Sequence, residues 1–395
     1  MNLDTKNLKN TSGMGFGEFN EAMDSYDSPM FVSFGMVPHN HDFAYIVHGE
    51  IYDDFCSRIA RLENVRQLGL TTASGEYAFT DHTRFLHSLV MAVMAERVLA
   101  RNGFSEEVVN LGIASSILHD MATPPFSDYG MLGAGAALDE ERAIELFRED
   151  RELQSTLGKY RMSWPDVVSC IRGEHPALGR LVNSNDSLDI DGVSYVAMDA
   201  AKIYGNRPDG GIAPYLQRPH LFDLHEDIVF HDGKPVFSDP DKTADFLAAR
   251  ALMFRDVYYS PQNRAREAFL ERELRRLWKE GVLKAERMVS MTDNGFRVLL
   301  EGNIPAGLYR AIFLDFYAFE ETRRMPADRL SEAGVESSGP DCVVYHKPPF
   351  KPKTRTPVMV RGIPAPLEDA LPEAATLIKE TARACDYVGV YRLKG

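Results

Sequence analysis

The sequence contains few cysteines, and their positions exclude the common cysteine-based sites. Four occur in 395 residues, and no two of them have the short spacing of a metal-binding or redox motif. Scattered cysteines of this kind are typical of reduced side chains in a protein core and not of a disulfide framework. The four are Cys56, Cys170, Cys342 and Cys385.

Long apolar runs are also missing. No stretch reaches the length that a transmembrane helix needs, and the N-terminal residues lack the apolar segment of a secretory signal peptide. We therefore expect a cytoplasmic protein that has no membrane partner.

The sequence contains fewer positively charged residues than negatively charged ones. The chain has 44 lysine and arginine residues against 58 aspartate and glutamate residues, which gives a formal net charge of −14. This balance argues against a surface that binds nucleic-acid backbones or anionic membranes, because both carry dense negative charge. It is compatible with a local basic pocket for a small phosphorylated molecule.

The remaining composition is that of an ordinary globular protein. Hydrophobic residues make up 44% of the chain and charged residues 26%, and the length allows a large core with two or three substructures. Residues 1–30 are rich in Asn, Gly, Ser and Asp and are predicted to form a flexible N-terminal arm. Helical patterns dominate residues 31–283, whereas residues 284–395 have the mixed character of an α+β lobe.

Within residues 284–395, four segments have strand character and one has helical character. Runs of β-branched and aromatic residues between polar ones indicate strands. The predicted strands are Phe296–Leu300, Cys342–Tyr345, Val358–Val360 and Val388–Tyr391, and the predicted helix is Pro364–Ala384.

Two histidines in apolar helical runs are the starting point for the chemistry. His87 lies in the run Thr83–Leu89, and His119 with Asp120 follows 32 positions later, near the end of a second run. A single histidine on such a helix is more often a packed or solvated residue than a ligand. An adjacent His-Asp pair is different, because imidazole and carboxylate together suit a divalent first-row metal. Three candidate ligands require a further carboxylate elsewhere in the chain.

Two spacings bring more candidates onto shared helix faces. Asp191, Tyr195 and Asp199 recur every four residues and would align on one face of a helix. Arg84 lies three residues before His87, so its guanidinium is placed to bind a phosphate oxygen in the bidentate way that lysine does not reproduce. The structural alternative for Arg84 is an ion pair on the helix surface.

Six stretches together resemble a known family. They are Val47-His48-Gly49, Arg66-Gln67-Leu68-Gly69, Arg84-Phe85-x-His87-Ser88-Leu89, Leu118-His119-Asp120 with Pro125-Phe126-Ser127, Asp189-Ile190-Asp191-x3-Tyr195-x3-Asp199, and Arg250-x7-Tyr258. Their order and spacing resemble the HD-domain phosphohydrolases, and they look most similar to the deoxynucleoside triphosphate triphosphohydrolase branch. The resemblance covers roughly residues 40–270.

The resemblance implies a mainly α fold, with an HD-domain helical core and a smaller C-terminal α+β lobe, and a homo-oligomer. It also implies that one divalent ion is held by His87, His119, Asp120 and Asp191. Two imidazoles and two carboxylates do not distinguish Mn, Mg, Fe, Ni, Co and Zn, although Mn or Mg is favoured. Such an ion would lower the pKa of a bound water and neutralise charge that develops on phosphoryl oxygens.

By the same resemblance, the substrate is a nucleotide or another phosphorylated small molecule. The best prediction is a dNTP, hydrolysed to deoxynucleoside and triphosphate by attack of water on phosphorus. The residues at the corresponding positions are Arg84 and Arg250 for phosphate, Gln67 and Leu68 near the sugar, and Tyr195, Asp199 and Tyr258 facing the substrate.

The chain departs from this family at positions that bind phosphate or transfer protons. Thr123, Asp128 and Asp139 stand where the triphosphohydrolases have histidines, and Gly192 stands where they have a phosphate-binding lysine. Two of these replacements are carboxylates, and like charges 4 Å apart repel by roughly 4 kcal/mol at an effective dielectric near 20. We therefore expect an intact metal centre beside a weakened polyphosphate site.

Proton transfer is then assigned to carboxylates, and three alternative functions stay open. The candidate proton-transfer groups are Asp139, Glu140 and Asp199, and the candidate catalytic residues are these three with the metal ligand Asp120. The first alternative is a phosphohydrolase that acts on a nucleoside monophosphate or a modified metabolite, and the second is a non-catalytic nucleotide-binding regulator. The third is a two-iron oxygenase, which would need His175 as an additional ligand. Otherwise His48, His82 and His175 fit structural roles.

Overall fold

The computed structural model describes residues 8–10, 21, 30–33, 44–67, 82–135, 144–204, 223–315, 318–329 and 339–394. Most of the predicted arm, residues 1–30, lies outside these ranges, as do Leu68, Asp139 and Glu140.

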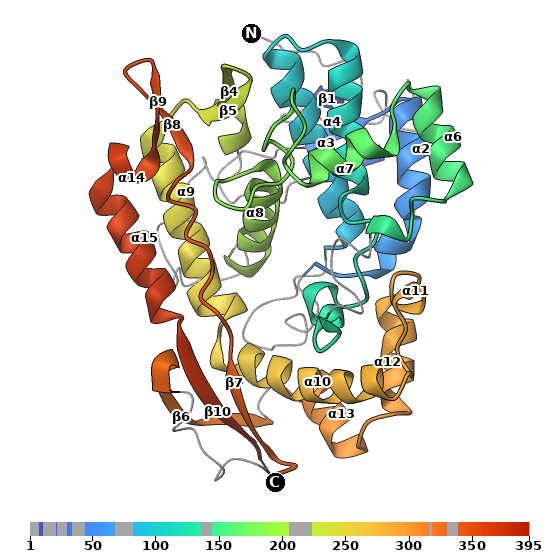
Figure 1. The fold of residues 1–395 in the computed structure, drawn as a ribbon, viewed down its shortest axis with the longest axis vertical. Helices are drawn as coiled ribbons and strands as arrows, with labels where there is room; N and C mark the ends of the chain where they lie inside the picture. Colours follow the sequence, from blue (N-terminus) through green and yellow to red (C-terminus); the bar gives the residue numbers. More distant parts are fainter. Residues whose placement is uncertain are drawn as a thin grey trace.

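The fold is mainly α, as predicted, and helix α8 lies near its middle, between α9 on one side and α3, α4 and α7 on the other (Figure 1). The helices up to residue 279 are α2 (Glu50–Ile59), α3 (Arg84–Arg101), α4 (Glu106–Leu118), α6 (Arg151–Lys159), α7 (Trp164–Ile171), α8 (Ile190–Tyr204), α9 (Pro240–Met253) and α10 (Pro261–Lys279). The later helices are α11 (Ala285–Met288), α12 (Asp293–Glu301), α13 (Ala306–Phe313), α14 (Leu367–Ala370) and α15 (Pro372–Ala384). Shorter turns are η1 (Ala60–Asn64), η3 (Ser127–Met131), η7 (Leu224–Asp227) and the π-helix η8 (Phe254–Tyr258), which continues α9.

Side-chain caps fix the start of α3 and α8, which carry His87 and Asp191. The Thr83 hydroxyl accepts a hydrogen bond from the backbone N–H of Leu86 at the start of α3. Asp189 plays the same part before α8, where its Oδ1 lies 2.7 Å from the backbone nitrogen of Gly192. Such caps satisfy N–H groups that the first helical turn leaves unpaired, and each typically contributes about 1 kcal/mol.

The main core forms where α3 packs against α4 and α8. Val90, Ile113 and Val193 are fully buried there, together with apolar residues of α2, α7 and α9. A second apolar cluster joins α10 to α12, α13 and the loop residues Ala122 and Phe126. The loop that follows His119 is therefore held between the two clusters.

The described strands form three small sheets. Their orders are β1-β3-β2, β6-β10-β7 and β4-β5-β8-β9. The strands are β1 (Leu8–Asn10), β2 (Met30–Ser33), β3 (Ala44–Val47), β4 (Ile228–His231), β5 (Lys234–Phe237), β6 (Phe319–Pro326), β7 (Cys342–His346), β8 (Pro357–Val360), β9 (Ile363–Pro366) and β10 (Tyr387–Leu393). All pairings are antiparallel except β5 with β8, where Phe237 lies opposite Val358.

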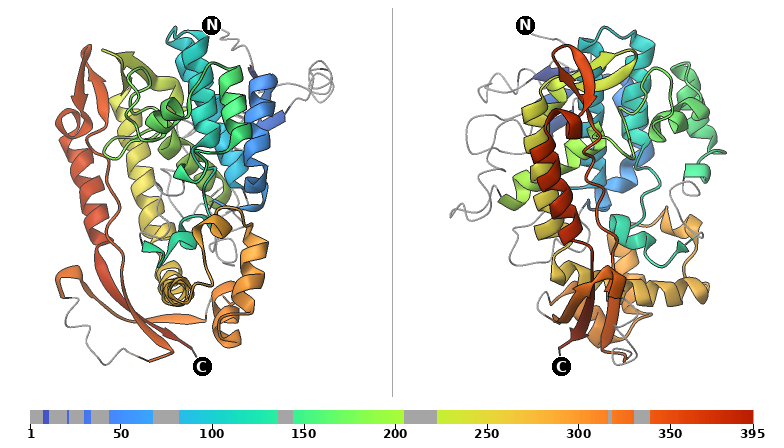
Figure 2. Two further views of the ribbon diagram at one scale, coloured as in Figure 1. Left: turned by 45° about the vertical axis from the view of Figure 1, so that its right-hand side comes forward. Right: turned by 60° about the vertical axis from the view of Figure 1, so that its left-hand side comes forward.

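The end of the chain returns to the helical core. Strand β8 joins the sheet of β4 and β5, and α15 lies alongside α9 (Figure 2). Phe350, Val358 and Ile378 are buried in the main core with residues of α3 and α8. The chain between β7 and β8 thus runs past the helices that carry the candidate site. The division of the chain at residue 284 stays a prediction.

The predicted strand Phe296–Leu300 is wrong, because these residues lie in helix α12. The Thr292 hydroxyl accepts from the backbone N–H of Gly295 and starts the helix, and Phe296 and Leu300 are fully buried at helical spacing while Val298 is exposed. The other three strands are confirmed as β7, β8 and β10. The helix predicted for Pro364–Ala384 is confirmed from Leu367 onward, since Ile363–Pro366 forms β9.

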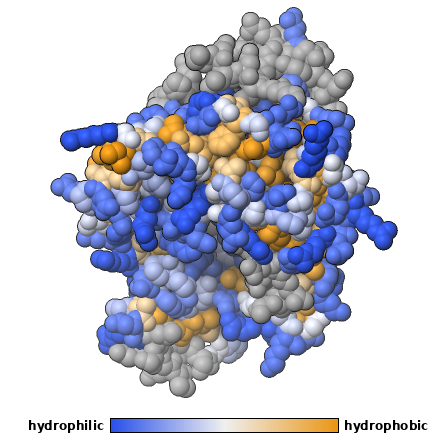
Figure 3. All heavy atoms as spheres, turned by 45° about the horizontal axis from the view of Figure 1, so that its top comes forward, coloured by the Kyte–Doolittle hydropathy of each residue, from blue (hydrophilic) through white to orange (hydrophobic). Residues whose placement is uncertain are grey.

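None of the helices in the described ranges combines the length and apolar character that crossing a membrane requires. On the face shown in Figure 3, hydrophilic residues predominate, and hydrophobic residues lie in small groups between them.

Candidate active site

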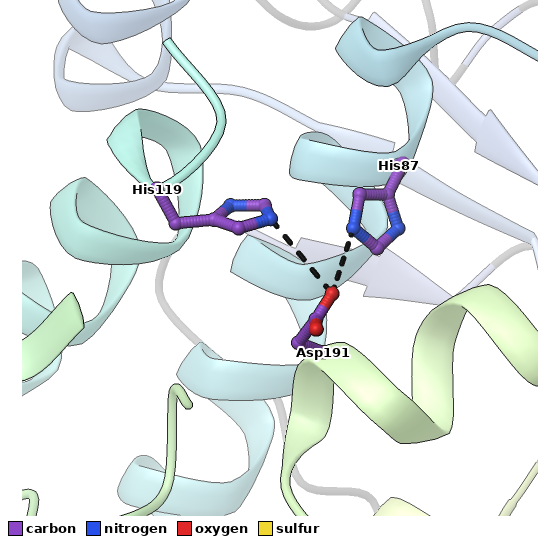
Figure 4. Close-up of side chains that lie close together, drawn as sticks. All are labelled: His87, His119 and Asp191. Atoms are coloured by element: carbon purple, nitrogen blue, oxygen red, sulfur yellow. Dashed lines mark hydrogen bonds and ion pairs between the residues drawn. The ribbon is translucent and has the colours of Figure 1, made fainter. Parts of the chain in front are cut away.

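Three predicted metal ligands meet at one point in the structure. His87 comes from α3, His119 directly follows α4, and Asp191 lies in the first turn of α8, and one ligand atom from each lies within 4.8 Å of the others. The Oδ1 atom of Asp191 is 3.0 Å from Nε2 of His87 and 3.9 Å from Nε2 of His119. Figure 4 shows both imidazoles turned toward this carboxylate. The described part of the chain holds no other group of this kind.

The fourth predicted ligand, Asp120, faces the same point. Its Oδ2 is 3.2 Å from Nε2 of His119 and 3.8 Å from Nε2 of His87. Its other oxygen, Oδ1, accepts a hydrogen bond from the Thr123 hydroxyl at 2.8 Å. Burial would raise the pKa of Asp120, but the Arg84 guanidinium and the neighbouring histidines outweigh burial and hold this pKa well below its usual range.

The hydrogen bonds behind the two histidines orient their ring nitrogens. Nδ1 of His119 donates to the carbonyl of Ser116 at 2.7 Å. The hydroxyl of Ser194 donates to the carbonyl of Asp191, so it is left to accept from Nδ1 of His87 at 3.1 Å. Both Nε2 atoms face the carboxylates, and Nε2 of His87 is hydrogen-bonded to Oδ1 of Asp191 at 3.0 Å. A cation that replaced the proton of this hydrogen bond would find both Nε2 atoms oriented as ligands.

The donor set fits a divalent cation. Nε2 of His119 is buried and makes no hydrogen bond to any described residue, although two carboxylates lie beside it. Burial lowers the pKa of His87. Burial would also lower the pKa of His119, but Asp120 and Asp191 outweigh it and raise that pKa, so the point between these side chains favours positive charge.

Arg84 lies in the wall of this site and is held by three neighbours. Its Nη1 donates to Oδ2 of Asp120 at 2.7 Å, and its Nε donates to the Ser127 hydroxyl at 3.0 Å. Asp128 lies 3.7 Å from Nη2. The guanidinium therefore orients Asp120 and at the same time lines the cavity described next.

A cavity of about 440 Å³ opens beside the candidate metal ligands His87, His119 and Asp191, which are called the metal group below. The predicted site residues in its wall are Gln67, Arg84, His119, Asp120, Asp191, Tyr195, Asp199 and Tyr258. Residues that the sequence analysis did not single out for the site also line it, among them Tyr129, Phe254, Tyr259, Glu267 and Lys347. The cavity wall thus combines candidate metal ligands with several aromatic side chains.

Three successive turns of helix α8 each contribute one side chain to the cavity wall. Asp191, Tyr195 and Asp199 all reach the cavity, so they lie on one face at successive turns, as predicted. At 1.5 Å per residue, Tyr195 and Asp199 stand about 6 and 12 Å along the helix from Asp191. Asp199 is buried, accepts a hydrogen bond from the Tyr258 hydroxyl at 2.5 Å, and lies 3.1 Å from Nε2 of His82.

Arg250 is close to the cavity but does not line it. Its Nε donates to the Tyr195 hydroxyl at 3.0 Å and its Nη1 donates to the carbonyl of Lys351 at 2.8 Å. The guanidinium also lies 4.6 Å from the ring centroid of Phe254 and 5.8 Å from that of Phe350. Here Arg250 fixes Tyr195 and the C-terminal segment, and its phosphate contact stays a prediction.

Some predicted residues are not brought to the site. Leu68, Asp139 and Glu140 lie outside the described residues, so their roles stay predictions. His175 lies in a turn, where its Nδ1 accepts from the backbone nitrogens of Ala177 and Leu178, and it belongs neither to the metal group nor to the cavity wall. The additional ligand of the oxygenase alternative is thus not supplied by His175.

The missed residues named above come from four separate parts of the chain. Tyr129 lies in η3, Phe254 begins the π-helix and Tyr259 follows it, Glu267 lies on α10, and Lys347 follows β7. No short motif links them. The one signal in the sequence is the dense run of lysine and proline at residues 347–353, which belongs to none of the six resembling stretches.

Comparison with known proteins identifies the fold. No family model matches the chain. An uncharacterized protein, YwfO of Bacillus subtilis (strain 168), is 26% identical over 249 residues, which cover 60% of this chain and 54% of that relative. The chain therefore matches about half the length of this curated relative.

Two solved structures superpose over most of the chain. A phosphohydrolase from Bacteroides thetaiotaomicron has a TM-score of 0.66 at 18% identity, covering 88% of this chain and 96% of the other. A hypothetical protein from Aquifex aeolicus has a TM-score of 0.67 at 19% identity, covering 92% and 96%. The chain thus shares the fold of a phosphohydrolase.

Proposed function

We propose that this protein is a metal-dependent HD-type phosphohydrolase that hydrolyses a phosphate ester of a nucleotide. The observation that carries the proposal is the position of the group His87, His119 and Asp191 beside a cavity whose wall also holds an arginine and several aromatic side chains. The candidate metal ligands and Arg84 suit a phosphate, and the aromatic side chains suit the rest of a nucleotide. The fold shared with a phosphohydrolase supports the same reaction class.

The residues around the metal group have distinct parts in this reaction. A divalent ion held by His87, His119, Asp120 and Asp191 would lower the pKa of a bound water and neutralise charge on the phosphoryl oxygens. Arg84 keeps Asp120 ionised and oriented, and it adds a permanent positive charge to the wall. The hydrogen bonds from Nδ1 of both histidines hold their rings in one orientation.

Proton transfer to the leaving group is proposed for a carboxylate. Asp199 is the candidate whose surroundings are described, since it lines the cavity and accepts from Tyr258. Its distance of about 12 Å along α8 from Asp191 favours a contact to the sugar over a contact to the phosphorus. Asp139 and Glu140 are proposed as the alternative proton-transfer groups.

The best substrate proposal is a dNTP that is cleaved to deoxynucleoside and triphosphate. Gln67, Tyr195, Asp199 and Tyr258 supply polar groups to the cavity wall, as a sugar would need. Asp128, where the triphosphohydrolases have a histidine, opposes a polyphosphate, but its side chain is 87% exposed and solvent screens its charge. A nucleoside monophosphate or a modified metabolite is the alternative substrate, and nucleotide binding without turnover is the alternative function.

Cytoplasmic location and homo-oligomeric assembly are part of the same proposal. Both come from the composition and the resemblance of the sequence motifs. Size-exclusion chromatography with light scattering tests the assembly, and a mass equal to that of one chain would contradict it.

Product analysis tests the function. Purified protein is incubated with Mn²⁺ or Mg²⁺ and a panel of dNTPs, NTPs and nucleoside monophosphates, and the phosphorus products are separated. We expect triphosphate from dNTPs with the wild type and none with His119→Ala, while the control His231→Ala, which removes an exposed histidine, stays active. Inorganic phosphate from monophosphates would shift the substrate to the alternative, and binding without any turnover would favour the regulator.

A further inference from the structure

The carboxylate of Asp293 joins two segments that are far apart in the sequence. Asp293 lies in the first turn of α12 and is 6% exposed. Its Oδ1 accepts a hydrogen bond from the backbone N–H of Phe126 at 2.7 Å, and its Oδ2 accepts from the backbone N–H of Arg66 at 3.0 Å. One buried carboxylate therefore holds both segments against the start of α12.

Both segments are also bonded to Arg84. The backbone N–H of Arg84 donates to the carbonyl of Val65 at 2.8 Å, and its side-chain Nε donates to the hydroxyl of Ser127 at 3.0 Å. Val65 and Ser127 are the immediate neighbours of the two residues that Asp293 binds. Hydrogen bonds thus connect Asp293, through one segment, to the backbone of Arg84 and, through the other, to its guanidinium.

The segment that carries Ser127 has a backbone that requires support. Phe126 has a φ of +58° and Ser127 a φ of +59°, in the left-handed region that such residues rarely adopt. A backbone of this kind persists only where neighbouring contacts hold it. Helix α12 supplies two of them, because Asp293 binds the N–H of Phe126 and the ring of Phe296 lies 5.7 Å from the ring of Phe126 between centroids.

The position of Ser127 determines how the guanidinium of Arg84 is oriented. The Ser127 hydroxyl accepts from both Nε and Nη2, and Nη1 donates to Oδ2 of Asp120 at 2.7 Å. A guanidinium has five N–H groups, so these bonds leave one on each Nη atom for a ligand, with Asp128 3.7 Å from Nη2. Because the group is planar, its bonds to Ser127 fix the directions in which the remaining N–H groups point.

We infer that Asp293 is a positioning residue for Arg84, which it orients through the left-handed turn at Phe126 and Ser127. Asp293 does not line the cavity, whereas Arg84 does. The inference rests on the proposed function only for the ligand of Arg84, a phosphate. It assigns to α12, which follows residue 284, a part in the site that involves no contact with substrate.

Hydrogen exchange of arginine side chains tests the positioning without any reaction. The full chain is labelled with ¹⁵N-arginine and measured by NMR with Mg²⁺ present, and the Nε–H signals of Arg84 and Arg250 are assigned from Arg84→Lys and Arg250→Lys. Arg250 is the internal reference, because its Nε donates to the Tyr195 hydroxyl at 3.0 Å, a bond in which Asp293 takes no part.

The variant Asp293→Asn removes one of the two backbone bonds, because an amide has one acceptor oxygen where the carboxylate has two. We expect the Nε–H of Arg84 to exchange about tenfold faster than in the wild type, as for the loss of one hydrogen bond, while that of Arg250 is unchanged. Asp293→Ser, which is smaller and also uncharged, gives the same comparison if Asp293→Asn does not fold.

Thr292→Ala is the matched control on the same helix. It removes the cap in which the Thr292 hydroxyl accepts from the backbone N–H of Gly295 at 3.3 Å, and it leaves both bonds of Asp293 in place. The exchange rate of Arg84 relative to that of Arg250 should therefore stay at the wild-type value. Urea unfolding measures how much stability each variant loses.

Three results would overturn the inference. The first is fast exchange of the Arg84 Nε–H in the wild type, because the bond to Ser127 would then be missing. The second is an unchanged rate for Arg84 in Asp293→Asn. The third is an equal acceleration of Arg84 and Arg250 in that variant, which would show a general loosening of the fold.

A double-mutant cycle connects the positioning to the reaction. If Asp293 acts through Arg84, the double variant Arg84→Lys/Asp293→Asn should have the same kcat/KM as Arg84→Lys alone. Losses that add would show that Asp293 affects the reaction by another route. A wild type that turns over no phosphate ester would contradict the phosphohydrolase proposal, whereas the exchange rates would still decide whether Asp293 positions Arg84.

Discussion

The ammonium of Lys353 lies 2.8 Å from Oδ2 of Asp189, two residues before the candidate metal ligand Asp191. Both side chains are nearly buried, and Asp189 also accepts from the backbone nitrogens of Ser184 and Gly192 at 2.7 Å each. The C-terminal segment thus fixes the start of α8 and with it the position of Asp191.

The same contact bears on the glycine at position 192. A Cβ atom there would lie 2.9 Å from Oδ1 of Asp189 and 3.8 Å from Nζ of Lys353. The family that the sequence resembles has a lysine at the position of Gly192. In this chain the position is occupied by glycine, and the ammonium of Lys353 lies beside it. That ammonium is bound to Asp189 and does not line the cavity.

Removing Lys353 should destabilise the protein strongly. In Lys353→Met the buried carboxylate of Asp189 loses its ion-pair partner, which costs about 3–5 kcal/mol in the free energy of unfolding. Urea unfolding measures this cost. The double variant Lys353→Met/Asp189→Asn, which removes both charges, should lose less than Lys353→Met alone. An equal or larger loss would show that the ion pair is not the cause.

Divalent metal should stabilise the wild type in proportion to occupancy. Mn²⁺ at 100 times its dissociation constant adds about 2.7 kcal/mol to the free energy of unfolding. We expect calorimetric titration to give one ion per chain for the wild type, and no binding at the same concentrations for His87→Ala or Asp191→Asn. Wild-type affinity in either variant would exclude the proposed ligand set.

Two glycines with left-handed backbone allow a matched test of packing. Gly133 has a φ of +72°, and a Cβ there would lie 2.7 Å from the backbone nitrogen of Arg275, whereas Gly103 has a φ of +73° and open space around it. Gly103→Ala should cost about 1–2 kcal/mol from the backbone alone. Gly133→Ala should cost a further 1–3 kcal/mol or so, because the backbone of α10 cannot move aside cheaply. Equal costs by urea unfolding would contradict the close packing of this loop on α10.

Glu226 should stabilise the fold only above acidic pH. Burial would raise its pKa, but the charges of His225, Arg97 and Arg101 outweigh burial and lower the pKa from its ordinary value of 4.5. A lowered pKa means that the folded state binds the proton less tightly than the unfolded state. The stabilisation is therefore present above pH 4.5 and is lost as the pH falls through the lowered pKa.

The variant Glu226→Gln checks this dependence. We expect it to lose about 1–3 kcal/mol relative to the wild type at pH 7, and the difference to shrink as the pH falls below 4.5. A difference that stays constant across this range would mean that shape, and not charge, accounts for the loss.

The candidate metal ligands could be predicted from the sequence because they lie in local sequence patterns. His87 and His119-Asp120 stand out in apolar helical runs, and the spacing of Asp191, Tyr195 and Asp199 correctly predicted a shared helix face. Such patterns depend only on helical periodicity, which neighbouring residues determine.

The cavity wall formed by Glu267, Lys347 and the neighbouring aromatic residues could not be predicted in the same way. Glu267 and Lys347 are 80 residues apart and meet only because the chain returns to the helical core after β7. The strand prediction for Phe296–Leu300 failed for a related reason, since a short apolar run does not distinguish a strand from a half-buried helix. There the Thr292 cap and the cluster on α10 decided the outcome.

Hydrolysis in ¹⁸O-labelled water tests the central claim most directly. Each nucleotide of the panel is incubated with the protein and Mn²⁺, and the position of the label is read from the isotope shift in the ³¹P spectrum. We predict label on the phosphorus of the released phosphate or triphosphate for the wild type, and no turnover without metal or in His119→Ala. Label in the nucleoside product, or equal turnover in the metal-free protein and in His119→Ala, would contradict metal-dependent attack of water on phosphorus.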